Sequence, residues 1–265
     1  MDILLKEFTM TAQWIQNLSW PEVEAYLARD TRCIIPVGST EQHGRFAPLG
    51  TDSYVAITLA EDASERTGTL VAPPMWCGFS PHHMVVPGTI TIRPEVLIEV
   101  LFDVLKSLAA HGFTSFVTIN GHRIVNICWM QIAAERAQRE LGVTVKIFDP
   151  AYMSKEIAEE LDFDPIGHGE NIEISHMLYR YPDLVHLEKA KDNPHTGKDL
   201  YHLDPQDPRD TLCYVPATVK DQRKILEATG DTIGGNPTTS TKERGKAYHD
   251  HLVGRLVEVL EGFTR

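Results

Sequence analysis

Apolar residues occur along the chain in two alternating patterns. Short continuous apolar runs are typical of strands buried on both faces, whereas apolar positions three or four residues apart are typical of helices that cover a sheet. The runs predict strands at 33–38, 69–72, 114–119 and 143–148. The spaced stretches predict helices at 20–29, 52–65, 93–111, 124–141, 154–161, 171–180 and 240–261. This alternation predicts an α/β fold with a mainly parallel sheet covered by helices on both faces.

One region departs from the alternation. Residues 187–238 contain repeated Asp, Pro, Asn and Gly, and we expect an irregular excursion there that serves as a lid or an oligomer contact. We expect the whole chain, 1–265, to form a single domain. No apolar run reaches the roughly 18–20 residues that span a bilayer, and the N-terminus lacks a signal-peptide pattern. A cytoplasmic location is therefore expected.

The formal net charge of −12 narrows the range of expected partners. Nucleic acids and anionic membranes are bound mainly by Lys and Arg, which neutralise phosphates, so we expect neither as a partner. The 4 cysteines stand far apart and form no C-x-x-C pair, so the sequence contains neither a zinc knuckle nor a redox dithiol. We therefore expect a small-molecule substrate rather than a nucleic acid or a membrane as the partner.

Side chains with metal-ligand chemistry follow the first predicted strand. The loop 38–44, with the sequence Gly-Ser-Thr-Glu-Gln-His-Gly, carries Glu41 and His43, and Asp52 follows shortly afterwards. Imidazole favours zinc-like metals, and carboxylates also accept Mn²⁺ or Mg²⁺. Such residues are also common in solvated loops, but the flanking glycines allow the close backbone approach that an ion site needs. Because a carboxylate can bridge two ions, Asp52 is the candidate for a bridging ligand.

Two later stretches add candidates. His122, in Asn-Gly-His, directly follows the predicted strand 114–119, at the sheet edge where ligands bind in such folds. His168, Glu170 and Glu173 lie at the start of a predicted helix. As isolated residues, His122 could be a cap or a surface residue. The two glutamates could be ordinary first-turn acids favoured by the helix dipole.

Taken together, these motifs resemble the creatininase (creatinine amidohydrolase) family. The resemblance rests on the loop 38–44 with Thr51-Asp52, then Pro-Gly-Thr at 87–89, Asn-Gly-His at 120–122, and Gly-His-Gly-Glu at 167–170 with Glu173 and Ser175, in the family's order. It implies a three-layer α/β/α fold and a site with two divalent ions, which would be zinc, manganese or both, with iron as a further option. It also implies a homo-oligomer, a hexamer in many family members.

The same resemblance implies roles for individual residues. Glu41 would bind one ion, His43 and His122 the other, and Asp52 would bridge the two. His168 would be the acid/base residue that protonates the leaving group. A water molecule activated between the ions would be the nucleophile, since a cation lowers the pKa of bound water to around 7.

The chain departs from the family pattern after His122. Family members usually continue with Gly-Gly-Asn, and creatininase itself has a liganding Glu two residues after this His, where the present chain has Ile124. Glu170 is our candidate for the missing ligand, and Glu173 would then orient a ligand or the helix. These two glutamates could also exchange roles.

A substrate pocket is expected beside the ions. Arg123 could hold an anionic or polyhydroxylated substrate with its guanidinium group, or could form a surface salt bridge. A loop with Gly, Pro and aromatic residues is of the kind that walls a pocket. Its candidate substrate-binding residues are Trp76, Ser80, His82 and His83, and we expect one of the two His to bind substrate and the other to be structural.

Three functions remain open from the sequence. The leading one is a metal-dependent hydrolase, an amidohydrolase acting on a small cyclic or amide-type substrate. Creatinine itself is not expected, because the ligand at position 124 is absent. The second is a hydrolase that opens a diketo-inositol ring at a carbon–carbon bond, with a role in inositol catabolism. The third is a non-catalytic metabolite-binding module that has lost one ion.

Overall fold

The sheet lies at the centre of the computed structural model, which describes residues 12–194 and 218–263. Within these residues one four-stranded sheet has the order β2-β1-β3-β4. Its strands are β1 (Arg32–Val37), β2 (Leu70–Val71), β3 (Ser115–Asn120) and β4 (Thr144–Phe148). All of its pairings are parallel, which confirms the expected parallel sheet.

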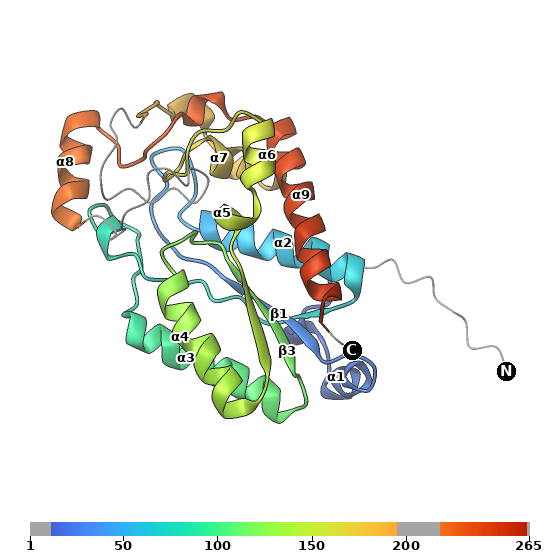
Figure 1. Cartoon of the computed structure of the whole chain (residues 1–265). Coiled ribbons are helices and arrows are strands. Elements are labelled where there is room, and N and C mark those ends of the chain that lie inside the picture. The colour runs from blue at the N-terminus through green and yellow to red at the C-terminus, as the bar shows by residue number, and fades with distance from the viewer. Residues whose placement is uncertain (1–11, 195–217, 264–265) are drawn as a thin grey trace.

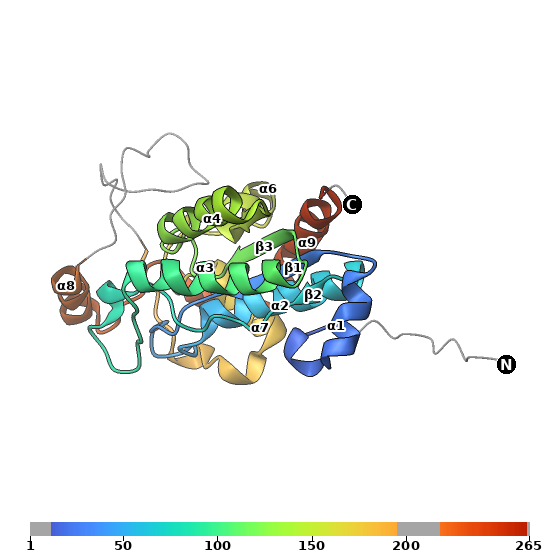
Figure 2. The same cartoon turned by 90° about the horizontal axis from the view of Figure 1, so that it is seen from below.

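Helices cover both faces of this sheet. α3 (Pro94–Ala110) and α4 (Ile127–Leu141) lie on one side, and α2 (Thr51–Thr67) and α9 (Lys242–Glu261) lie on the other (Figure 1, Figure 2). Successive side chains of β1 alternate between two cores, because strand residues point to opposite faces. Cys33 and Ile35 join the core under α3 and α4, whereas Ile34 joins the core under α2 and α9. The expected three-layer α/β/α arrangement is confirmed.

Shorter helices complete the layers. They are α1 (Trp20–Leu27), α5 (Pro150–Met153), α6 (Lys155–Glu160) and α7 (Asn171–Arg180). The predicted start of α1 is confirmed, since Ser19 and Glu22 form a capping box at its first turn. Among the helices that the structure describes, none is both long and apolar enough to cross a membrane.

Part of the region 187–238 is more regular than expected. α8 (Val219–Thr229) is an 11-residue helix, and the Thr218 hydroxyl caps it by accepting from the backbone N–H of Asp221. Its buried residue is Gln222, and the half-buried Val219, Ile225 and Leu226 lie on the same face of the helix. The Thr-x-x-Asp capping pattern was a further sequence signal. Residues 195–217 of the predicted excursion lie outside the described residues, and its role as a lid or oligomer contact stays a prediction.

The turn between β3 and α4 holds Ile124 in an unusual conformation. Its φ is 66°, in the left-handed region that β-branched residues rarely adopt. Asp149 fixes the turn by accepting hydrogen bonds from the Ile124 N–H at 2.9 Å and from the Asn120 amide at 2.7 Å. The side chain of Ile124 packs against the core under α2 and α9.

This conformation predicts an inverted order of stability for two small substitutions. Ile124→Ala and Ile124→Gly remove nearly the same packing, but only glycine relieves the left-handed backbone. We expect the Gly variant to be more stable than the Ala variant by about 1 kcal/mol, measured as the free energy of unfolding in denaturant. An Ala variant as stable as the Gly variant would show that the turn carries no strain.

Candidate metal centre

The ends of two neighbouring strands bring the candidate ligands together. Val37, the last residue of β1, pairs with Asn120, the last residue of β3. The loop after β1 leads into α2, which carries Asp52, while His122 follows β3 directly. A Cβ at Gly121 would lie 1.9 Å from the carbonyl oxygen of Asp52, so only glycine permits this close approach. The sheet edge therefore holds the expected motifs side by side.

Asp52 lies between two imidazole rings. Its Oδ1 is 3.2 Å from Nε2 of His43, and its Oδ2 is 3.1 Å from Nδ1 of His122. All three residues are buried. Each carboxylate oxygen thus faces one ring, which is the arrangement of a carboxylate that bridges two ions.

Two groups of ligand atoms flank this carboxylate. Glu41 joins Asp52 and His122, with its Oε1 3.3 Å from His122 Nδ1. His43 instead lies near His168 and Glu173, with its Nε2 3.5 Å from Glu173 Oε2. This grouping differs from the expected one, in which His43 and His122 shared an ion. The two rings approach opposite oxygens of Asp52, so they belong to different sides of the centre.

The donor atoms at this centre fit divalent ions. Both carboxylate oxygens of Glu41, Nε2 of His43 and Oδ2 of Asp52 are buried and have no hydrogen-bond partner within the described residues. Buried polar atoms are almost always paired, because an unpaired one costs free energy. Oxygen and imidazole nitrogen donors of this kind suit zinc, manganese and related ions. The loop after β1 and the first turn of α2 therefore leave unpaired ligand atoms at a common place.

Charges at the centre explain shifted pKa values. Burial opposes protonation of His43, but the nearby carboxylates of Asp52, Glu173 and Glu41 together outweigh burial and raise the pKa of His43 to about 10. In His122, Glu41 and Asp52 likewise outweigh burial and raise the pKa to about 9. Burial raises the pKa of the Glu41 carboxyl group. Without ions, both rings thus carry protons at neutral pH.

Metal uptake is therefore expected to release protons. An ion needs neutral imidazole, so at pH 7 both His43 and His122 must lose a proton when ions bind, and apparent affinity should rise with pH up to about pH 10. Titrating metal-free protein with Zn²⁺ in weak buffer with a pH indicator should show roughly two protons released per chain. Binding without proton release would show that these rings do not face the ions.

Arg123 is buried against two glutamates. Its Nη2 lies 2.6 Å from Oε1 of Glu170 and 2.7 Å from Oε1 of Glu173. Only 8% of Arg123 is exposed, so its ion pair is buried and is not the surface salt bridge considered from the sequence, while its contact with substrate stays a prediction. The two carboxylates neutralise this cation.

The same contacts separate the roles of the two glutamates. Glu173 uses Oε1 for Arg123 and turns Oε2 toward His43, where it also accepts the Gly169 N–H at 2.9 Å. Glu170 belongs to none of the possible metal-binding groups among the described residues. This geometry favours the exchange of roles, with Glu173 rather than Glu170 at the ion position.

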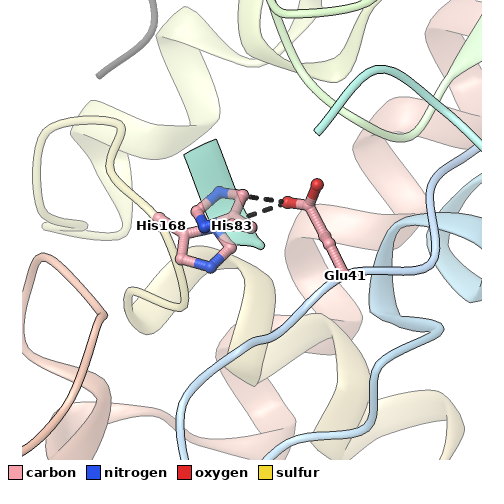
Figure 3. A group of neighbouring side chains, drawn as sticks. All are labelled: Glu41, His83 and His168. Carbon is pink, nitrogen blue, oxygen red and sulfur yellow. Dashed lines mark ion pairs between the residues drawn. The ribbon is translucent and has the colours of Figure 1, made fainter. Parts of the chain in front are cut away.

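A third group of side chains, Glu41, His83 and His168, lies beside the first two (Figure 3). Oε1 of Glu41 is 3.5 Å from His83 Nε2 and 3.7 Å from His168 Nδ1. His83 comes from a short 3-10 helix (Pro81–His83), and His168 comes from the loop before α7. Both rings that lie near Glu41 therefore come from segments other than the loops that follow β1 and β3.

Gln42 fixes the orientation of His83. The side-chain oxygen of Gln42 accepts from the Gly44 N–H at 3.0 Å and from the Thr232 hydroxyl. Its amide nitrogen must then donate to Nδ1 of His83, 2.8 Å away. Burial lowers the pKa of His83, which keeps the ring neutral. The remaining proton of His83 is therefore on Nε2, which faces the centre as a donor.

His168 has the opposite tautomer. Its Nε2 lies 2.5 Å from the backbone carbonyl oxygen of Gln42 and donates to it. The ring is neutral, since burial lowers its pKa, and Nδ1 then presents a lone pair toward Glu41. Gln42 was not predicted as a site residue, although it stands between Glu41 and His43 in the sequence. The contact of Gln42 with Thr232 had no sequence signal.

The other predicted pocket residues are divided. Ser80 lies in the centre, with Oγ 3.5 Å from Nε2 of His122. The ring of His82 lies against that of His83 in a tilted arrangement, with the ring centres 4.0 Å apart, and burial lowers the pKa of His82 to about 3. Trp76 is 41% exposed at the surface. Thus His83 faces the ligands, and His82 lies behind it.

Comparison with known proteins assigns the chain to a family. A family profile described as "Creatininase: Creatinine amidohydrolase" matches residues 16–260. The chain belongs to the creatininase family. The matched residues include every candidate ligand.

Two curated relatives resemble the chain over most of its length. The 3-dehydro-scyllo-inosose hydrolase of Thermotoga maritima is 30% identical over 196 residues, which cover 71% of this chain and 62% of the relative. The creatinine amidohydrolase of Pseudomonas putida is 29% identical over 239 residues, which cover 83% of this chain and 91% of the relative. The match thus spans less than two thirds of the first relative and most of the second.

Solved creatininase structures share the fold. A crystal structure of creatinine amidohydrolase (creatininase) has a TM-score of 0.77 at 27% identity and covers 94% of this chain and 96% of its own. Two other structures, a mutant creatininase of "Zn-Zn type" and "Creatininase Mn", each reach a TM-score of 0.75 at 25% identity. Divalent metal binding is thus supported for this fold and for the donor groups of the present chain.

Proposed function

We propose that this creatininase-family hydrolase uses two divalent ions, zinc or manganese, to hydrolyse a small cyclic or amide-type substrate. The observation that carries the proposal is Asp52, whose two oxygens face His43 and His122 at 3.2 and 3.1 Å. When bound, such ions would lower the pKa of a coordinated water molecule to about 7 and polarise the carbonyl group of the substrate.

The proposed ligands follow the two observed groups. Glu41 and His122 would hold one ion, His43 and Glu173 would hold the other, and Asp52 would contribute to both. The unpartnered atoms of Glu41, His43 and Asp52 support this assignment. Glu173 takes the place of the carboxylate that position 124 lacks. Because Arg123 holds its other oxygen at 2.7 Å, Glu173 is presented in a fixed orientation.

Proton handling falls to the two histidines beside Glu41. His168 has a free Nδ1 lone pair and can accept a proton from the attacking water, then return it to the leaving group. His83 offers its Nε2–H as a donor to a substrate oxygen. Gln42 keeps the two rings in these different tautomers through its contacts of 2.8 and 2.5 Å. The pair thus separates hydrogen-bond donation from proton transfer.

Opening of a diketo-inositol ring is the second candidate function. The relative from Thermotoga maritima, 30% identical over 71% of this chain, supports it. Two glutamates neutralise the Arg123 guanidinium, so this side chain does not offer an unpaired positive charge to an anionic substrate. A neutral, hydroxyl-rich ring fits this environment. Water would add to one carbonyl, the adjacent carbon–carbon bond would break, and His168 would protonate the departing carbon.

The third candidate, a non-catalytic binding module, depended on Ile124 as a missing ligand. Glu173 provides a carboxylate 3.5 Å from His43, which removes the main reason for that candidate.

We also propose a homo-oligomer, a hexamer by family resemblance. Sedimentation velocity on the full chain tests it.

A substrate screen tests the proposed function. Protein loaded with Zn²⁺ or Mn²⁺ would be assayed with creatinine, other cyclic amides and keto-inositols, with Asp52→Ala as the control. We expect turnover of a cyclic amide or of a keto-inositol, none of creatinine, and none by the control. Release of an amine would select C–N cleavage, and turnover of keto-inositols alone would select C–C cleavage. Activity that survives in the control would overturn the proposal.

A further inference from the structure

Two buried histidines lie outside the metal centre and have no role in the proposed reaction. His176 is on α7 and His249 is on α9, and neither appears in a possible metal-binding group among the described residues. Nε2 of His176 lies 2.8 Å from Nδ1 of His249. Nε2 of His249 lies 2.8 Å from Oδ2 of Asp62, on α2. Asp62 is 22% exposed, so this row of side chains runs from the surface into the core.

Close helix packing makes the row possible. A Cβ at Gly245 would lie 1.8 Å from the carbonyl oxygen of Ser175, so the glycine lets α9 approach the backbone of α7. His249 follows Gly245 by one helical turn and meets His176, the neighbour of Ser175. The row is therefore a built feature of the packing between α7 and α9.

The hydrogen bonds of the row have one direction when both rings are neutral. The Asp62 carboxylate can only accept, and it also accepts from Nη1 of Arg180 at 3.0 Å. His249 must then donate from Nε2 and accept at Nδ1, so His176 donates from its own Nε2. This leaves Nδ1 of His176 as an acceptor. Burial lowers the pKa of His176, which agrees with a neutral ring.

The inner end of the row reaches a small cavity. Nδ1 of His176 and Nη1 of Arg123 are both buried and have no hydrogen-bond partner within the described residues. Both residues line the cavity, which has room for about one water molecule. Its other lining residues are Val55, Gly121, Ile172, Glu173 and Tyr248. An unpaired donor and an unpaired acceptor at one small cavity are the partners that a buried water molecule needs.

We propose that an ordered water molecule in this cavity accepts from Arg123 and donates to His176, and that the row from Asp62 through His249 and His176 holds Arg123 in place. His176 and His249 are then positioning residues. They act through Arg123 on Glu173, which lies 2.7 Å from the guanidinium and turns its other oxygen to the ion position. The effect on Glu173 rests on the proposed metal-dependent function.

The water site can be tested without activity. A high-resolution crystal structure of the wild-type chain should show an ordered water within hydrogen-bonding distance of both Arg123 Nη1 and His176 Nδ1. A dry cavity would overturn the inference whether or not the protein is a hydrolase. This outcome is distinct from failure of the proposed function, which would appear as wild-type protein that binds no divalent ion.

The positioning role can be tested by metal titration of three full-chain variants. His176→Leu removes the acceptor, whereas the side-chain oxygen of His176→Asn can replace Nδ1. Ser175→Ala is the matched control, because it removes a buried polar group of α7 that lies outside the row. Competition with a chelator would measure the affinity of each of the two Zn²⁺ positions.

We expect His176→Leu to weaken one Zn²⁺ position by about 10-fold and leave the other unchanged, as for supporting residues around metal ligands. His176→Asn should restore most of that loss, and Ser175→Ala should affect neither position. Equal affinities in the Leu variant and the wild type would overturn the positioning role. Equal weakening in Ser175→Ala would overturn it as well, because general loosening of α7 would then explain the effect.

Discussion

Asp52→Ala is expected to remove both ions and to lower turnover by about 10³-fold or more. The variant takes away the one carboxylate that faces His43 and His122 together, at 3.2 and 3.1 Å. Charge stabilisation by bound ions contributes several kcal/mol to such reactions, and about 4 kcal/mol corresponds to this factor. Metal analysis by mass spectrometry and steady-state kcat on the substrate found by screening would measure the two effects.

Asp52→Asn separates charge from shape in this experiment. Asparagine fits the same space and keeps one oxygen, but it cannot give an anionic oxygen to each side. We expect it to lose ions nearly as completely as the alanine variant. If Asp52→Asn retained two ions per chain and normal kcat, the bridging role of Asp52 would be wrong.

Glu173→Gln is expected to empty one ion position, whereas Glu170→Gln should leave both filled. Both glutamates contact Arg123 at similar distances, so each variant leaves the cation one carboxylate partner. Only Glu173 turns an oxygen toward His43. Metal affinity at the His43 side should fall by about 100-fold or more in Glu173→Gln and by no more than about 10-fold in Glu170→Gln.

The two variants therefore form a matched pair. Isothermal titration of metal-free protein with Zn²⁺ would give the stoichiometry and affinity of each. A greater loss in Glu170→Gln than in Glu173→Gln would restore the assignment first favoured by the sequence. Equal losses would show that the two carboxylates act only through Arg123.

The fold was predictable because its pattern is local. Apolar runs such as 114–119 must be buried on both faces, and the spaced apolar stretches between them can only cover the sheet. α8 escaped prediction because its few large apolar residues, Val219, Ile225 and Leu226, follow a long stretch rich in Asp, Pro, Asn and Gly. Where so few apolar positions stand beside many turn-forming residues, apolar periodicity is a weak signal of a helix.

The sequence indicated which residues gather at the candidate site, but not how their side chains face one another. His122 and the loop 38–44 meet because their parallel strands end at the same edge. Which oxygen of Asp52 each ring faces depends on side-chain rotation, which the sequence does not encode locally. The proposed choice of Glu173 over Glu170 depends on which way the first turn of α7 faces, and the contacts of both carboxylates with buried Arg123 support it. That burial arises from packing between distant segments.

If the Asp52 carboxylate serves both sides of the centre as proposed, the first cation to bind would take up part of the negative charge that the second needs. Two like-charged ions a few ångströms apart also repel each other. Occupancy should therefore proceed in steps, with a mononuclear form persisting whenever metal is scarce. Cellular metal supply, rather than the amount of polypeptide, would then set the fraction of competent molecules.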